Sequence, residues 1–225
     1  MWYQRKISIP TDWKGKKILL HFGAVDYQAE VFIDGQFIGR HIGGSSSFCM
    51  DLTRFAKAGN THNLIVYVKD EQRSGLQTIG KQCNNFYSGG CSYTRVTGIW
   101  QTVWLEAVAP AGLKTVVIRP DIDQQQFVIE PEFYNESDGT LEVTLLDGQK
   151  TIGRKSVKCA NSSTVILPVK KPKLWTPETP HLYDIIYRIK DTQGHLIDEV
   201  KSYAGMRKVH TANGLFYLNN EPYYQ

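Results

Sequence analysis

The chain has 225 residues, of which 41% are hydrophobic and 12% aromatic, so it can bury a substantial core and does not have the composition of a disordered protein. Its 26 basic and 22 acidic residues give a net charge of +4 that is spread along the chain, which argues against a nucleic-acid partner. The length favours two domains.

Short strands separated by turns dominate the first part of the chain. Alternating apolar residues predict a strand that ends at Pro10, and a second run covers residues 17–22. The clearest turn is Asp34-Gly35, because this pair supplies the positive φ angles of a type I′ hairpin. We therefore expect a hairpin over residues 29–40, followed by strands near 48–52 and 63–69.

The strand pattern stops between Asp70 and Ser92, where glycine and asparagine are frequent. Loops of this length are uncommon inside compact domains and are often functional. Amide, ammonium and aromatic side chains suit a polyol ligand, and the loop offers Lys81, Gln82, Asn84, Asn85, Phe86 and Tyr87. A disordered insertion is the alternative interpretation.

The segment that follows, residues 93–106, has the pattern of a central strand. Large side chains alternate to both sides from Ile99 to Glu106, which predicts a strand packed between two layers. Gly98 just before it suits a bulge or a close approach of another backbone. Trp100 and Trp104 are expected to pack and to bury large apolar areas.

Pro110 marks a boundary, after which a second series of strands begins. Strands are expected at 113–119, 127–134, 141–146, 156–157, 164–169, 182–190 and 199–203. Turn signals every ~8 to 12 residues are typical of a sandwich of immunoglobulin type. The last segment reads as a hairpin around Asn219-Asn220 whose continuation is absent.

Catalytic and metal-binding motifs do not appear in the sequence. The six histidines form no i, i+4 pair and the four cysteines have no CxxC spacing, so neither a metal nor a cofactor is expected. Glu130 and Glu132 project from one face of a strand, but Pro131 between them points to a solvated edge strand. Cys83 and Cys91 share one loop, and either a disulfide or single thiols fit that spacing.

The N-terminus lacks the pattern of a signal peptide, and no apolar run reaches the ~18 residues that a membrane helix needs. We therefore expect no membrane span. The cysteine content does not decide the compartment.

Four stretches resemble signatures of the non-catalytic N-terminal domains of glycoside hydrolase family 2, the family of β-galactosidases, β-glucuronidases and β-mannosidases. In chain order they are Asp26 to Gly35, Gly98 to Glu106, Trp175 to Tyr183, and Gly205 to Val209 with Phe216 to Pro222. Together these stretches extend over nearly the whole chain.

The resemblance implies an all-β chain in three parts. Residues 1–109 are expected to form a jelly-roll, galactose-binding-like sandwich that is N-terminally incomplete, and residues 110–204 an immunoglobulin-like β-sandwich. Residues 205–225 are expected to be the first hairpin of a truncated (β/α)8 barrel domain.

The same resemblance implies the activity of a longer parent. The family hydrolyses O-glycosidic bonds with retention, using two glutamates of the barrel that would lie beyond Gln225. No catalytic residue is therefore expected in this chain, which should be inactive alone. The parent is expected to be most like a β-galactosidase and to act on a β-linked oligosaccharide or glycan.

Three residues are carried over as candidates for the rim of the substrate pocket. Gly80-Lys81-Gln82 resembles a Gly-Lys-Gln of bacterial β-galactosidase-like members, in a loop that approaches the mouth of the active site. Arg95 matches an arginine common just before the Gly-Ile-Trp segment. Some β-galactosidases place an acidic substrate contact a few positions before that arginine, where this chain has Ser92 and Tyr93. Structural roles are expected for Gly98, Trp100, Trp104, Trp175 and Tyr183.

The resemblance also implies contact with the missing barrel, allows a homo-oligomer, and favours a periplasmic or extracellular location over a cytoplasmic one, as for a bacterial glycan-degrading enzyme. Two other classes remain open. One is a stand-alone pair of carbohydrate-binding modules without hydrolase activity, and the other is a surface interaction protein, which leaves residues 205–225 unexplained.

Overall fold

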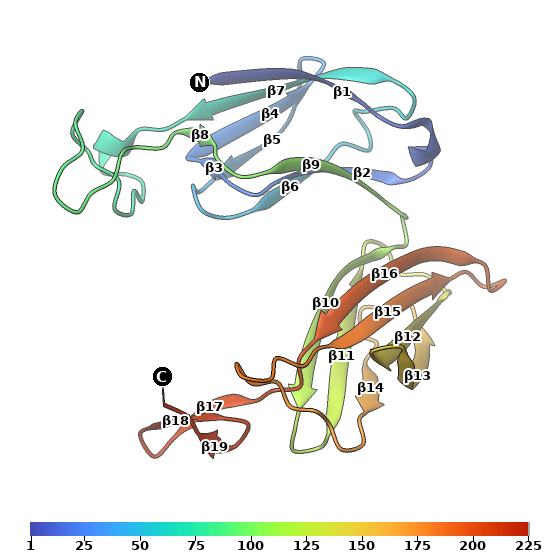
Figure 1. Ribbon diagram of the computed structural model, residues 1–225. Helices are drawn as coiled ribbons and strands as arrows, with labels where there is room; N and C mark the ends of the chain where they lie inside the picture. The colour runs from blue at the N-terminus through green and yellow to red at the C-terminus, as the bar shows by residue number, and fades with distance from the viewer. Residues whose placement is uncertain (225) are drawn as a thin grey trace. The chain divides into compact units, whose positions relative to one another are not determined.

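The computed structural model describes residues 1–224, which fold almost entirely into β-strands (Figure 1). The chain divides into two compact units, unit 1 over Met1–Val108 and unit 2 from Ala109 onward. Each unit contains its own hydrophobic core. The prediction of an all-β chain built from sandwiches is confirmed.

Unit 1 is a sandwich of two antiparallel sheets. One has the strand order β1-β7-β4-β5 and the other β6-β2-β9, and a short pair joins β3 to β8. The strands are β1 (Trp2–Ser8), β2 (Lys17–Phe22), β3 (Val25–Asp26), β4 (Gln28–Ile33), β5 (Gln36–Ile42), β6 (Phe48–Asp51), β7 (Thr61–Lys69), β8 (Gly98–Ile99) and β9 (Val103–Val108), with 3-10 helices η1 (Thr11–Trp13) and η2 (Gln72–Ser74).

The core of unit 1 follows from the two-residue period of its strands. Successive side chains point to opposite faces, so every second residue of a strand enters the space between the sheets. Burial of each such large aliphatic or aromatic side chain contributes ~1.5–3 kcal/mol. The buried set contains Val31 and Ile33 of β4, Leu64, Val66 and Val68 of β7, and Ile18, Leu20 and Phe22 of β2.

The expected hairpin at Asp34-Gly35 is confirmed. Both residues have positive φ, 49° and 80°, and they join β4 to β5. Asp34 also reaches β7, since its carboxylate accepts the backbone N–H of Asn63 at 2.7 Å and lies 2.7 Å from Nδ1 of His62. The hydrogen bond from Asn63, followed by that from His62, lowers the pKa of Asp34. The turn is thus bonded to the neighbouring strand as well as to its own hairpin.

The prediction of one continuous strand from Ile99 to Glu106 is wrong. The pairing breaks between β8 and β9, and β9 pairs only with β2 among the described strands. Val103 and Leu105 pack against the core, but Trp104 is 45% exposed and Trp100 is 48% exposed. The expectation that both tryptophans are buried therefore fails, because Trp104 is on the outward face of the edge strand β9 and Trp100 lies in the break between β8 and β9.

Unit 2 contains a sandwich of the sheets β10-β11-β14 and β13-β12-β15-β16, followed by a three-stranded sheet β17-β18-β19. Its strands are β10 (Leu113–Asp121), β11 (Gln126–Phe133), β12 (Thr140–Asp147), β13 (Lys150–Lys158), β14 (Val165–Pro168), β15 (Tyr183–Lys190), β16 (Leu196–Ala204), β17 (Val209–Ala212), β18 (Leu215–Leu218) and β19 (Glu221–Pro222). Strand β13 is much longer than the expected residues 156–157.

Two aromatic residues fill the centre of the second sandwich. Tyr183 and Tyr187 are each 1% exposed, and Tyr183 packs edge-on against Phe127 at 5.7 Å between ring centroids. The Tyr183 hydroxyl accepts the backbone N–H of Lys173 at 2.8 Å, which satisfies its polar end. The residue thus combines core packing with attachment of the segment before β15.

The prediction that Pro131 lies on an edge strand is wrong, because its strand, β11, is the central strand of its sheet. Strand β11 lies between β10 and β14 in its sheet. The pairing of β11 with β14 ends at Ile129, however, so Pro131 lies beyond the paired residues. The N–H that proline lacks is therefore not needed for a hydrogen bond to β14. Glu130 and Glu132 form ion pairs with Arg119 and Lys114, as expected of a solvated face.

The last sheet is attached to the sandwich of unit 2 by polar contacts. Asn219 and Asn220 have φ of 54° and 68°, as expected of a two-residue turn, and they join β18 to β19. The Asn219 side chain donates to the Trp175 carbonyl at 2.9 Å and accepts from the Lys208 amide at 3.0 Å. Asp123 binds Lys208 at 2.6 Å and Asn220 at 2.9 Å. Gln225, the end of the expected third part, lies outside the described residues.

Candidate functional site

The longest connection in unit 1 is residues 70–97, called here the long loop, which joins β7 to β8 and projects from one end of the sandwich (Figure 1). Part of it folds back on itself. The Tyr93 amide donates to the Lys81 carbonyl at 3.0 Å, and the Cys83 amide donates to the Tyr93 carbonyl at 2.9 Å. The loop therefore has a defined internal structure.

Gln82 connects the long loop to the sandwich. Its Nε2 donates to Oδ2 of Asp26 at 2.9 Å. Its Oε1 accepts from Nε2 of Gln72 at 2.7 Å and from the backbone N–H of Val96 at 2.6 Å. One amide thus joins β3, η2 and the end of the loop, so its main structural role is to position the loop.

Two carboxylates anchor this network. Asp26 is 7% exposed, and burial raises its pKa, with the charge of Asp70 adding to the shift and the bond from Gln82 opposing it. Asp70 accepts from Gln77 at 2.6 Å, from Thr97 at 2.5 Å and from Gln72 at 3.3 Å. These bonds hold the start and the end of the loop together.

Glycines enclose Asp26. Gly98 pairs with it across the β3–β8 bridge. An ideal Cβ on Gly44 would lie 2.3 Å from Oδ1 of Asp26, so only glycine allows this approach. Trp100 donates from its indole Nε1 to the Gly44 carbonyl at 2.8 Å. Although exposed, Trp100 therefore has a structural contact beside the loop.

The three expected rim residues have different surroundings. Lys81 is exposed, and its ammonium has no hydrogen bond or ion pair within residues 1–224. Arg95 donates to the Asn85 carbonyl at 3.0 Å and lies 5.9 Å from the Phe86 ring centroid. A polar hollow of about 540 Å³ is lined by Asp70, Glu71, Gln72, Arg73, Ser74, Arg95 and Thr97. Of the three candidates only Arg95 lines it.

Sequence reasoning missed Asp26, Asp70 and Gln72. Asp26 precedes Gln82 by 56 positions, so no local pattern connects the two residues. The length of the loop and its content of amides indicated that the loop is functional, but they did not indicate which of its residues organise it. The residues that organise it became identifiable only through the strand pairing that brings β3 to β8.

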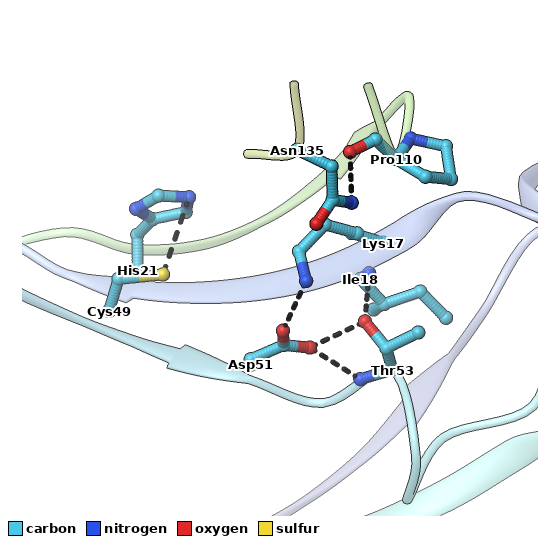
Figure 2. Close-up of polar contacts among 8 residues, drawn as sticks. All are labelled: Lys17, Ile18, His21, Cys49, Asp51, Thr53, Pro110 and Asn135. Atoms are coloured by element: carbon cyan, nitrogen blue, oxygen red, sulfur yellow. Dashed lines mark hydrogen bonds and ion pairs between the residues drawn. The ribbon is translucent and has the colours of Figure 1, made fainter. Parts of the chain in front are cut away.

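The outward face of the β6-β2-β9 sheet is a second cluster of polar side chains (Figure 2). His21 stacks on Trp104 at 4.8 Å between ring centroids, and its Nε2 lies 2.9 Å from Glu106. The same Nε2 lies 3.9 Å from Sγ of Cys49 (Figure 2). Lys17 binds Asp51 at 2.7 Å (Figure 2). Partial burial, with the charges of Asp51 and Glu106, raises the pKa of Cys49, which disfavours the thiolate.

The four cysteines are free, with Cys83 buried and Cys91 exposed, so the disulfide alternative is not realised. Across residues 1–224 no three histidine, cysteine or acidic side chains are arranged to hold a metal ion. No helix of the described chain is long and apolar enough to cross a membrane.

The described chain thus contains two β-sandwiches, the first of which carries a long loop rich in amides and carboxylates. Residues 1–109 match the family model described as glycosyl hydrolases family 2, sugar binding domain, and residues 111–207 match the one described as glycosyl hydrolases family 2. The chain belongs to glycosyl hydrolases family 2, which confirms the resemblance.

Relatives in this family are much longer than the chain. A β-galactosidase of Thermoanaerobacter pseudethanolicus is 28% identical over 98% of this chain and 30% of its own length. A putative β-glucuronidase of Formosa agariphila is 29% identical over 98% of this chain and 26% of its own length. The solved β-glucuronidase from Ruminococcus gnavus in complex with D-glucuronic acid superposes with a TM-score of 0.82 at 25% identity, over 99% of this chain and 39% of that one.

Proposed function

We propose that this chain is the non-catalytic N-terminal part of a longer retaining β-glycosidase, in which it serves as scaffold and the long loop contributes to the rim of the substrate pocket. The chain covers 30% of the β-galactosidase relative and 39% of the solved β-glucuronidase. The two catalytic carboxyl groups, ~5 Å apart in a retaining enzyme, would lie beyond Gln225 in a barrel domain whose first hairpin is residues 205–225.

The rim assignment rests on the different roles of two neighbouring residues of the long loop, Gln82 and Lys81. Gln82 is bonded to Asp26, Gln72 and Val96, so it holds the backbone in place. The neighbouring Lys81 is exposed, with its ammonium available to a ligand hydroxyl or carboxylate. A positioned loop with an available cation is suited to substrate orientation, because ordering costs are met before binding.

For the sugar, we propose a β-galactosidase-like specificity. The hollow beside η2 contains the carboxylates Asp70 and Glu71 and the guanidiniums Arg73 and Arg95, so its lining has no net positive charge. Asp70 and Glu71 would repel the carboxylate of a uronic acid, and the β-galactosidase of Thermoanaerobacter pseudethanolicus, 28% identical over 98% of this chain, supports the same choice. A β-glucuronidase is the second candidate, supported by the solved relative bound to D-glucuronic acid.

The test is hydrolysis by the full-length parent, expressed with this chain at its N-terminus, of nitrophenyl β-galactoside and nitrophenyl β-glucuronide. A larger kcat/KM on the galactoside supports the proposed specificity, and a larger value on the glucuronide supports the second candidate. Hydrolysis of neither compound would contradict the glycosidase assignment for these sugars. Activity of the isolated chain would contradict its non-catalytic role.

The rim is tested separately with Lys81→Ala in the parent. We expect kcat/KM to change at least about fivefold, or roughly 1 kcal/mol, with an unchanged melting temperature. Lys150→Ala, an exposed lysine at the start of β13, is the matched control. Equal kinetics for both variants would remove Lys81 from the rim.

A stand-alone carbohydrate-binding pair is the alternative class. Calorimetry of the isolated chain with galactose, lactose and glucuronate separates the two ideas. Binding tighter than ~1 mM without the parent favours the module, because an affinity of that size represents a preformed site. No heat with any of these sugars favours the scaffold role.

A further inference from the structure

The long loop, which projects from one end of the unit 1 sandwich (Figure 1), exposes two adjacent aromatic side chains. Phe86 is 72% exposed and Tyr87 is 82% exposed, and their rings meet edge to face at 4.9 Å between centroids. Large apolar side chains that are exposed singly are ordinary on a protein surface, whereas a contiguous exposed group marks a binding surface. The pair is therefore a candidate contact for a ligand.

The two aromatic residues line a hollow that residues 83–95 form by themselves, called here the aromatic hollow. Its volume is about 300 Å³, at the lower end of the range for small-molecule sites. Asn85, Thr94 and Arg95 add polar groups to the same lining. All of the lining belongs to the long loop, so no strand edge and no other segment takes part in it.

Bonds within the long loop hold the aromatic hollow in shape. The buried Cys83 thiol donates to the Tyr87 carbonyl at 3.6 Å. Arg95 donates to the Asn85 carbonyl at 3.0 Å and thereby joins the two limbs of the loop. Binding to a surface that is already ordered costs less conformational entropy than binding to a mobile one. The aromatic hollow is thus preorganised for a ligand.

The lining of the aromatic hollow matches the chemistry of one sugar residue, which has C–H groups on its ring faces and hydroxyl groups around its edge. The Arg95 guanidinium lies over one face of the Phe86 ring, 5.9 Å from the centroid, and the exposure of Phe86 leaves the other face open. An open aromatic face attracts the C–H groups of a sugar ring. The side-chain amide of Asn85 has no hydrogen bond within residues 1–224, so it can donate to one sugar hydroxyl and accept from another.

Arg95 connects the aromatic hollow to the hollow beside η2, because it lines both of them. Two hollows that share one wall are arranged to hold consecutive residues of one chain-like ligand. A guanidinium has five N–H donors, and in Arg95 one of them bonds to the Asn85 carbonyl. The remaining donors are therefore available to sugar oxygens where the two hollows meet.

We propose that the long loop binds two consecutive residues of a β-linked oligosaccharide, one in the hollow beside η2 and the next in the aromatic hollow. Phe86 and Tyr87 stack on the second sugar, and Arg95 binds at the junction. This inference rests on the proposed function, since it adds a second sugar position to the rim of the substrate pocket. It assigns the parent a preference for oligosaccharides over simple glycosides.

The first experiment compares two substrates of the full-length parent, methyl β-galactoside with one sugar residue and β-1,4-galactotriose with three. Phe86→Leu keeps the apolar bulk and removes the flat aromatic face. In this variant the ratio of kcat/KM for the trisaccharide to kcat/KM for the methyl glycoside should fall at least about fivefold. Tyr87→Phe keeps the ring and should keep the ratio. Tyr203→Ala, at an exposed tyrosine of unit 2, is the control and should also keep it.

An unchanged ratio in Phe86→Leu overturns the proposal. This holds also if both values of kcat/KM fall together, because an equal loss would mean that Phe86 packs against another part of the parent and not against a sugar.

The second experiment measures binding without hydrolysis, so that the subsite and the proposed function can fail separately. Saturation-transfer NMR of this chain with β-1,4-galactotriose detects complexes weaker than ~1 mM. Transfer to the ring C–H protons of the sugar should be present in the wild type and at least about fivefold smaller in Phe86→Leu. No transfer in the wild type overturns the subsite even if the parent is an active glycosidase. Transfer to a sugar that the parent does not hydrolyse supports the subsite and contradicts the proposed function.

Discussion

The hydroxyl of Tyr3 occupies the space in which a side chain at position 98 would stand. An ideal Cβ on Gly98 would lie 2.1 Å from Oη of Tyr3, and the backbone there has φ of 103°. The same hydroxyl accepts the N–H of Ile99 at 3.2 Å, across 96 positions of sequence. The first strand of the chain and β8 therefore approach closely only because residue 98 is glycine.

Gly98→Ala should destabilise unit 1 by about 3 kcal/mol or more, because it combines an unfavourable φ with a collision at Tyr3. Gly148→Ala is the control, since that residue has φ of 60° and no atom within 4 Å of its ideal Cβ. It should cost only the ~1–2 kcal/mol of a left-handed residue. Urea unfolding of both variants measures the difference, and equal costs would mean that Tyr3 is not the obstacle.

Trp104→Ala should cost only about 1–1.5 kcal/mol, because the side chain is 45% exposed and its principal aromatic contact is the stack on His21. Phe22→Ala, at a fully buried position of β2, should cost about 3–5 kcal/mol. Denaturation midpoints of the two variants test this order. If Trp104→Ala lowered stability as much as Phe22→Ala, the result would mean that the Trp104 side chain is part of the core.

The raised pKa of Asp26 predicts a pH dependence of stability. The folded protein retains this proton at pH values where the unfolded chain, with a pKa of ~3.9, has released it. The stabilisation is therefore complete below the unfolded pKa and is lost as the pH rises through the folded pKa. Asp26→Asn removes it, so the free energy of unfolding of the wild type minus that of the variant should fall as the pH rises above ~4.

The contribution of Asp34 to stability should depend on pH in the opposite direction, which Asp34→Asn tests. Bonds from Asn63 and His62 lower the pKa of Asp34, so its contribution is present above the unfolded pKa and is lost as the pH falls through the folded pKa. The difference between wild type and this variant should therefore grow as the pH rises. Urea titrations from pH 3 to 7 compare the two, and parallel trends would contradict the assignment of Asp26.

Asn219→Gly should loosen the last sheet without strain at the turn, because glycine also adopts φ of 54°. The variant loses the bonds to the Trp175 carbonyl and the Lys208 amide, each worth ~1 kcal/mol. Trypsin cleavage after Arg207 or Lys208 should become at least about fivefold faster. Asn213→Gly, at another residue of positive φ, is the control and should be cleaved at the rate of the wild type.

Local turn chemistry made part of the fold predictable. Asp34-Gly35 and Asn219-Asn220 each specify a hairpin through the φ angles of two adjacent residues, and both hairpins were expected at the correct positions. Strand β13 was mostly missed because it contains lysines, an arginine and Gly153 and has little apolar alternation. Its position depends on pairing with β12, which is a non-local property.

The segment around Trp104 shows why large side chains alone do not indicate burial. Large side chains on both faces of the segment predict a strand between two layers. The ring of Trp104 instead points outward and stacks on His21 at the surface. The long loop was expected to be functional from its length, and Gln82 was among its candidates. Its bond to Asp26 depends on the β3–β8 pairing, so its positioning role was not readable from the sequence.

The Asp34-Gly35 turn also bears on the order in which unit 1 assembles. Strands β4 and β5 are joined by two residues, so their contact closes a short loop and forms on a scale of microseconds. Strand β1 must instead find β7 across most of the unit, with Trp2 opposite Tyr67. Contacts of such sequence separation form late because loop closure costs entropy before it is offset. We expect β4 and β5 to nucleate the sheet and β1 to be the last of its strands to join.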